Sequence, residues 1–131
     1  MRCCMDYRGI NSVTKRNAAP LPRMDDLLDS VQDIQVMSSL DLAAGYHQIP
    51  LLPNECERSA FHCGNRLMEF TVMPFGPTNA PAVFSEFMTT ILRKQINDGF
   101  VLVYLDDVLI ISKSPEQHLE HLRAVLAVFK Q

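Results

Sequence analysis

The segment that most constrains this chain is V-L-V-Y-L-D-D-V-L-I-I, residues 101–111, in which two adjacent aspartates interrupt an apolar run. As a single buried strand it would carry Asp106 and Asp107 into the core, where an unpaired carboxylate is costly. The aspartates instead divide the run into two short stretches, which predicts a hairpin whose turn is built on the acidic pair. Aspartate is also a common turn former, so the pair alone does not establish a functional site.

The rest of the chain alternates between helical and extended patterns. The expected elements are a helix from Pro22, a strand over 36–42, a hairpin with strands over 59–63 and 67–73, a helix over 82–95 and a final helix after Ser114. Thr78 or Asn79 would cap the helix over 82–95. This order predicts an α+β fold, in which helices pack on one face of an antiparallel sheet.

The final helix has clear signals at its start. Ser114 is the expected N-cap, Pro115 occupies the first helical position, and Gln117 completes a capping box. The helical spacing predicts an apolar stripe made of Leu119, Leu122, Leu126 and Phe129. His118 and His121 lie one turn apart and are suited to metal binding, but an exposed helical face is the favoured interpretation.

A third carboxylate, Asp41 in S-L-D-L, also stands at the end of an expected strand. Clustered carboxylates repel one another unless a cation lies between them. Mg²⁺ is held by one or two carboxylates together with substrate phosphates. Two such ions about 3.5–4 Å apart promote phosphoryl transfer. The residue types permit such a site, and they equally permit a structural ion.

Composition limits the remaining classes of function. The net charge of −3 argues weakly against a nucleic-acid partner, although the first 23 residues hold five basic residues and one acidic residue. No apolar run reaches the roughly 18 residues of a membrane span, and the N-terminal residues do not resemble a signal peptide. The four cysteines lack a repeated C-x-x-C spacing, and the carboxylates lack a calcium-loop pattern. A structural zinc or calcium module is therefore a poor interpretation.

Several stretches of the chain together resemble the motifs of reverse transcriptases. Y-L-D-D, in V-L-V-Y-L-D-D-V-L-I-I-S-K-S, is similar to the Y-x-D-D motif of that family. The accompanying stretches are M-D-Y-R-G-I-N, S-L-D-L-A-A-G-Y-H-Q-I-P and M-P-F-G-P-T-N-A-P-A-V-F. They occur in the family's order and cover essentially the whole chain. They resemble the gypsy-type branch of LTR retrotransposons, in which the domain is part of a Pol polyprotein.

The resemblance implies a fold, a reaction and its partners. The fold would be the palm and part of the fingers of a right-handed polymerase, with about 1–35 and 50–75 on the fingers side. The reaction would be RNA-directed DNA synthesis, in which a primer 3′-hydroxyl attacks a dNTP with the help of two Mg²⁺ or Mn²⁺ ions. The partners would be a primed RNA or DNA template, dNTPs and the rest of the polyprotein, in the cytoplasm or in retroelement particles, without a membrane.

The resemblance also assigns roles to individual residues. The metal-binding catalytic residues would be Asp41, Asp106 and Asp107. The residues that contact the nucleotide or the primer would be Arg2, Leu42, Tyr46, Phe75, Gly76, Tyr104 and Leu105. Arg2 would contact the triphosphate, for which a guanidinium is well shaped. Tyr46 would exclude a 2′-hydroxyl, although a half-buried core tyrosine is the structural alternative.

Two features depart from the family pattern. Pro77 stands where the family commonly has leucine, and proline removes an N–H and fixes φ. The thumb, connection and RNase H regions have no counterpart in the 131 residues, so we expect the chain alone to lack processive synthesis. The alternative hypothesis is a catalytically inactive or domesticated remnant that acts by binding or has no function.

Overall fold

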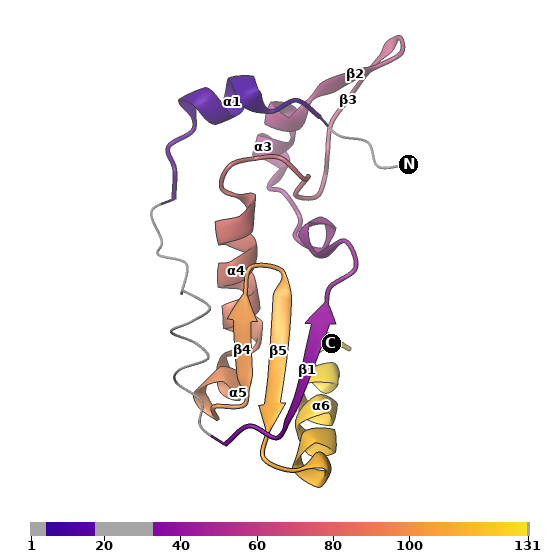
Figure 1. The fold of residues 1–131 in the computed structure, drawn as a ribbon. Helices are drawn as coiled ribbons and strands as arrows, with labels where there is room; N and C mark the ends of the chain where they lie inside the picture. Colours follow the sequence, from indigo (N-terminus) through magenta and orange to yellow (C-terminus); the bar gives the residue numbers. More distant parts are fainter. Residues whose placement is uncertain (1–4, 18–32, 131) are drawn as a thin grey trace. The chain divides into compact units, whose positions relative to one another are not determined.

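The computed structural model describes residues 5–17 and 33–130, which divide into two compact units. Among these, the first unit contains residues 5–17 and 43–84, and the second contains 33–42 and 85–130. Figure 1 shows the elements of each unit along the chain. The helix expected from Pro22 lies outside the described residues. No helix within the described part is both long and apolar enough to cross a membrane.

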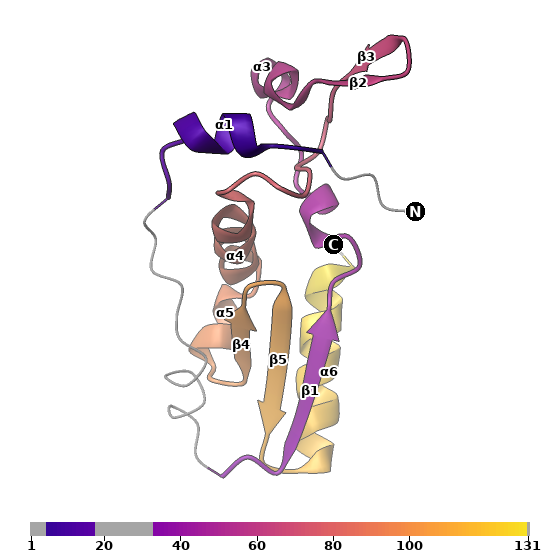
Figure 2. The same cartoon turned by 45° about the horizontal axis from the view of Figure 1, so that its top comes forward.

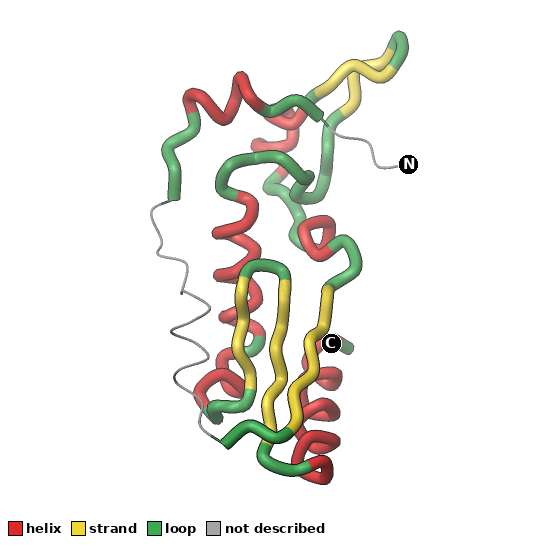
Figure 3. The backbone as a smooth tube through the Cα atoms, viewed as in Figure 1, coloured by secondary structure: helices red, strands yellow, loops and turns green. Residues whose placement is uncertain are grey.

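The second unit is built on a three-stranded antiparallel sheet with the order β1-β5-β4 (Figures 1 and 3). The strands are β1 (Val36–Asp41), β4 (Val101–Tyr104) and β5 (Asp107–Ser112). The predicted hairpin over residues 101–111 is therefore confirmed. Its turn is formed by Leu105 and Asp106, while Asp107 already begins β5, one position earlier than a turn made of both aspartates implies.

Helix α6 (Pro115–Phe129) packs on one face of this sheet against β5 and β1, and lies behind β1 in both views (Figures 1 and 2). Its predicted N-cap is confirmed, because Gln117 N donates a hydrogen bond to Ser114 Oγ at 3.3 Å. The side chain of Gln117 reaches one residue further back than a capping box requires and accepts from Lys113 N at 3.0 Å. The start of α6 is thus fixed by local sequence.

The prediction of which α6 residues are buried is wrong in part. Leu119 and Leu126 are 56% and 47% exposed, whereas Val125 is fully buried. His118, which was expected on an exposed face, is only 5% exposed. The reason is that two serines of the sheet provide hydrogen-bond partners for the imidazole, so a polar residue replaces a leucine against the strands.

The long helix predicted over 82–95 is two helices, α4 (Ala80–Ile91) and α5 (Arg93–Asn97). Leu92 lies between them and is fully buried. The helical hydrogen bonds continue on either side, from Leu92 N to Met88 O and from Ile96 N to Leu92 O. Asn79 precedes α4, but its side chain bonds to the backbone of Asn17 and Lys15.

The first unit contains short helices and one small hairpin. The helices are α1 (Arg8–Val13) and α3 (Pro53–Cys56), with 3₁₀ turns at Gly45–Gln48 and Glu57–Ser59. The hairpin strands β2 (Phe61–Cys63) and β3 (Arg66–Met68) are shorter than predicted. Beyond β3, the chain pairs with residues 49–51 instead, through Leu51 N to Thr71 O and Met73 N to Ile49 O.

Candidate active site

The β4–β5 turn presents the acidic pair at one end of the sheet of the second unit. Val101, Val108 and Ile110 are fully buried, so the apolar residues of both strands form part of the core. Leu105 adopts a left-handed conformation with φ of 53°, which allows the chain to reverse direction within two residues. As a result Asp106 is half-buried in the turn and Asp107 is exposed.

The carboxylate from β1 meets the acidic turn through strand pairing. Asp41 is the last residue of β1 and pairs with Asp107 in the β1–β5 register. Tyr104 pairs with the same Asp107 from the other side, in the β4–β5 register. Residues directly opposite in an antiparallel pair point to the same face, with Cβ atoms about 4.5–5.5 Å apart. Asp41, Asp107 and Tyr104 therefore share one face of the sheet.

This arrangement places two like charges against each other. Like charges directly opposite on neighbouring strands are destabilising, and both Asp41 and Asp107 are exposed. Within the described residues, no three His, Cys, Asp or Glu side chains are grouped closely enough to hold a metal ion. The sheet thus brings Asp41 and Asp107 together with Asp106 one residue away, and a site that uses all three carboxylates stays a prediction.

Tyr46 belongs to the first unit, where it is held by aromatic neighbours. Its ring centroid lies 5.0 Å from that of Phe75 and 5.1 Å from that of Phe84, and Tyr46 is 9% exposed. Gly45 allows this packing, because an added Cβ would lie 2.5 Å from Phe84 Cζ. Phe75 is 44% exposed and also contacts His47 edge-on. Tyr46 and Phe75 are therefore neighbours, and their role in a nucleotide pocket stays a prediction.

Gly76 is constrained both by its backbone and by its surroundings. Its φ is 113°, and an added Cβ would lie 2.7 Å from Tyr7 Cδ2. Asn11 Nδ2 donates to Gly76 O at 3.0 Å, and Thr78 N donates to Asn11 Oδ1 at 2.8 Å. Asn11 thus ties the loop on both sides of Pro77 to α1. Sequence reasoning missed Asn11, although its place in M-D-Y-R-G-I-N was a usable signal.

The structure says less about the other residues that were predicted to contact the nucleotide or the primer. Leu42 follows β1 directly and is half-buried, as are Tyr104 and Leu105. Arg2 lies outside the described residues. The role of each in substrate binding stays a prediction.

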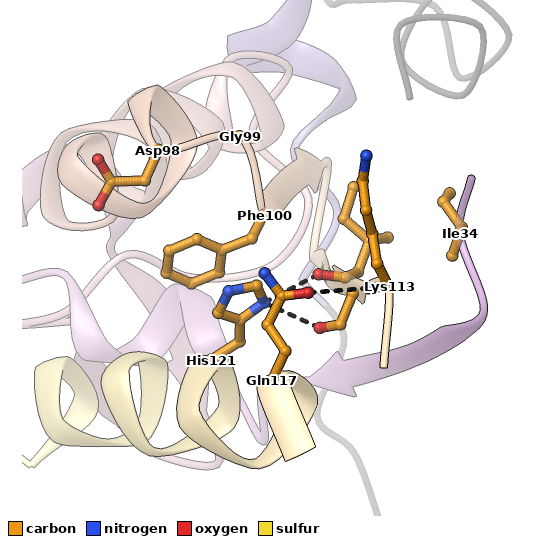
Figure 4. A pocket seen from close by; sticks show the side chains of 9 residues that line it. Ile34, Asp98, Gly99, Phe100, Lys113, Gln117 and His121 are labelled. Carbon is orange, nitrogen blue, oxygen red and sulfur yellow. Dashed lines mark hydrogen bonds between the residues drawn. The ribbon is translucent and has the colours of Figure 1, made fainter. Parts of the chain in front are cut away.

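A second polar region lies at the opposite end of β5 from Asp107 and was not predicted. His121 and Gln117 of α6 line a cavity of about 170 Å³ together with Phe100 and Lys113 (Figure 4). The His121 ring stacks on Phe100, with centroids 3.9 Å apart and an interplanar angle of 13°. Histidines one helical turn apart were the available sequence signal, but their partners come from distant strands.

Comparison with known families gives a match along the full chain. The family described as "Reverse transcriptase (RNA-dependent DNA polymerase)" matches residues 1–131. The Transposon Tf2-3 polyprotein of Schizosaccharomyces pombe is 37% identical over 130 residues, which are 99% of this chain and 10% of that protein. The Transposon Tf2-7 polyprotein of the same organism is 36% identical over the same coverage. The chain thus spans about a tenth of the length of these relatives.

Solved structures with the same fold come from a foamy virus. The native protease-reverse transcriptase of prototype foamy virus matches 99% of this chain and 17% of its own, with a TM-score of 0.85 and 27% identity. A foamy viral protease-reverse transcriptase in complex with double-stranded DNA matches 94% of this chain and 21% of its own, with a TM-score of 0.81 and 25% identity.

Proposed function

The chain belongs to the reverse transcriptase family, and from that premise we propose that it supplies the catalytic carboxylates of an RNA-directed DNA polymerase. The observation that carries the proposal is the register that sets Asp41 opposite Asp107. Two exposed carboxylates in this position repel each other unless a cation lies between them. Their hard oxygen atoms are the ligands that Mg²⁺ prefers. The donor set therefore fits a divalent cation.

In this proposal, Asp41 and Asp107 hold the divalent ions together with Asp106. Bound Mg²⁺ or Mn²⁺ would neutralise charge on the attacking and leaving oxygens of a nucleotidyl transfer. The short turn at Leu105 keeps Asp106 and Asp107 at the same end of the sheet as Asp41, and we propose that bound cations draw the three carboxylates together. Tyr104, on the same face as Asp107, would form the surface on which the primer end rests.

We further propose that Tyr46 selects the sugar of the incoming nucleotide. Its ring is fixed between Phe75 and Phe84. A ring with so little freedom can exclude an extra hydroxyl group by steric contact. Phe75 and Gly76 would line the same nucleotide pocket, and Arg2 would contact the triphosphate.

The partners follow from the relatives and from the charge of the chain. A foamy viral relative has been solved in complex with double-stranded DNA, and by likeness we propose a primer–template duplex for this chain. Affinity for nucleic acid comes largely from phosphate contacts, and the chain has a net charge of −3. Much of the duplex contact would therefore come from other parts of a longer polyprotein, acting inside cells and in retroelement particles.

Primer extension by a longer polyprotein that contains this chain tests the proposal. Asp107→Asn should abolish dNTP incorporation with Mg²⁺ and with Mn²⁺, because it removes a metal-binding charge and changes little else. Asp98→Asn is the matched control, since Asp98 is an exposed aspartate of the same unit at the end of α5. Incorporation by Asp107→Asn at the level of the control would contradict the proposal and favour an inactive remnant.

A further inference from the structure

His118 bridges the two strands that carry the paired aspartates. It is 5% exposed and lies between the sheet and α6. Its Nε2 is 2.8 Å from Ser38 Oγ in β1, and its Nδ1 is 2.8 Å from Ser112 Oγ in β5. Both ring nitrogens are thus used, each by a different strand.

The positions of the hydrogens follow from the neighbouring acceptors. His121 Nδ1 lies 3.0 Å from Ile111 O and 2.8 Å from Ser112 Oγ. A carbonyl oxygen only accepts, so His121 Nδ1 carries a proton and donates toward both atoms. Ser112 Oγ then donates its own hydrogen to His118 Nδ1, which leaves His118 Nε2 as the donor to Ser38 Oγ.

The span of the imidazole matches only one register of β1 against β5. Ser38 pairs with Ile110 and Ser112 pairs with Val36, so the two serines are diagonal neighbours. Diagonal neighbours on one face of a sheet are about 7–8 Å apart, which leaves room for one ring with a hydrogen bond at each side.

Other registers would break this bridge. A slip of β1 by one residue would move each of its side chains, including those of Ser38 and Asp41, to the face of the sheet opposite its present one. A slip by two residues keeps the faces but sets Ser38 either directly opposite Ser112, too close for a bridging ring, or opposite Val108. In the second case the serines would be four residues apart along the strand, which is about 13 Å at 3.3 Å per residue.

We propose that His118 is a positioning residue that fixes the register of β1 and β5 and thereby sets Asp41 opposite Asp107. The inference rests on the proposed function for its catalytic meaning, but the register itself is a property of the metal-free chain. In either two-residue slip, Asp41 would lie opposite Leu105 or Leu109 and the carboxylate pair would be lost. The bridge joins the middle of β1 to the end of β5 away from Asp107, and it acts without touching substrate.

His121 provides a matched control for this role. It lies one turn along the same helix and stacks on Phe100 (Figure 4). Its hydrogen-bond partners Ser112 and Ile111 both belong to β5. Loss of His121 therefore weakens the attachment of α6 to β5. It does not remove a link between β5 and β1.

The test compares His118→Phe, Ser38→Ala and His121→Phe in the 131-residue chain. Cross-strand NOEs in metal-free protein report the register, and titration with Mn²⁺ reports affinity at the aspartates. We expect weakened or altered NOEs between β1 and β5 in both of the first two variants. Their Mn²⁺ affinity should fall by about tenfold, the lower end of typical losses when groups that orient metal ligands are removed. His121→Phe should keep the wild-type register and affinity even if its unfolding temperature falls.

If His118→Phe does not fold, Ser38→Ala still decides the test. This substitution removes only the hydroxyl group of β1 that His118 contacts. Wild-type NOEs and affinity in Ser38→Ala and His118→Phe would overturn the proposal, as would an equal loss in His121→Phe. If the wild-type chain binds no Mn²⁺ at the aspartates, the proposed function fails, whereas the NOEs of the metal-free variants still decide whether His118 sets the register.

Discussion

Asp41 and Asp107 face each other across the last pair of the β1–β5 ladder, with both side chains exposed. Asp107 also pairs with Tyr104 of β4, so this end of the central strand has a carboxylate on one side and an aromatic ring on the other. A pair of like charges in this position lowers the stability of the sheet. In the proposed function, this cost is offset when a divalent cation binds between the two carboxylates.

Asp107→Asn should therefore stabilise the chain when no divalent metal is present. Removing one of two opposed charges should raise the free energy of unfolding by up to about 1 kcal/mol, the upper range for cross-strand pairs. Added Mg²⁺ should then stabilise the wild type more than the variant, since the variant lacks one of the carboxylates that bind the ion. Urea denaturation with EDTA and with Mg²⁺ measures both effects. A variant less stable than wild type in EDTA would contradict the repulsion.

Tyr46→Val should relax sugar selectivity in a longer polymerase that contains this chain. The smaller side chain opens the space that a 2′-hydroxyl needs, and steric discrimination of this kind is typically worth about tenfold or more. Tyr46→Phe is the control, because it keeps the ring that packs on Phe75 and Phe84. Single-nucleotide incorporation of ribonucleotides and deoxyribonucleotides gives the ratio. Equal ratios in Tyr46→Val and wild type would refute this role.

Gly76→Ala should destabilise the first unit by about 1–3 kcal/mol, because the new Cβ meets the Tyr7 ring and φ is positive. Gly64→Ala is the matched control: φ is 59° there, and an added Cβ has no neighbour within 4 Å. Denaturant unfolding should show a larger loss for Gly76→Ala, which combines the contact with Tyr7 and the φ further from the left-handed α region. Similar losses in both would show that neither of these two features of Gly76 matters.

Glu116→Gln should lower stability at neutral pH but not in strong acid. Hydrogen bonds from its own backbone N–H and from Ser114 at the start of α6 hold the pKa of Glu116 below its ordinary value of 4.5. A lowered folded-state pKa gives stability above the unfolded-state pKa that is lost as pH falls through the folded-state pKa. Thermal unfolding at pH values from 7 downward should show a difference between variant and wild type that shrinks as the pH falls below 4.5 and through the lowered folded-state pKa of Glu116. Glu120→Gln, one turn further along α6, should show a smaller effect at pH 7.

Local patterns predicted those parts of the structure that depend on local chemistry. The interrupted apolar run correctly predicted the β4–β5 hairpin, and the Ser114 cap correctly predicted where α6 begins. The turn is displaced by one residue because Leu105 adopts the left-handed conformation, which a leucine rarely does and which no local preference indicates.

Local patterns could not predict contacts between residues that are far apart in the sequence. The spacing of Leu119 and Leu126 indicated the buried face of α6, but the sheet offers hydroxyl groups at Ser38 and Ser112 that favour His118 instead. Likewise, the partner of Asp41 depends on which strand lies beside β1. The resemblance to reverse transcriptases suggested the aspartate pair, and the register of β1 against β5 provides its physical basis.

The most direct measurement of the central claim is the location of bound Mn²⁺ in the isotope-labelled chain. Paramagnetic broadening of backbone signals should be greatest around Asp41 and residues 105–107, and should be lost in Asp107→Asn but kept in Asp98→Asn. Broadening centred on another group of carboxylates, or unchanged in Asp107→Asn, would contradict the claim that this aspartate pair is the metal site of the polymerase.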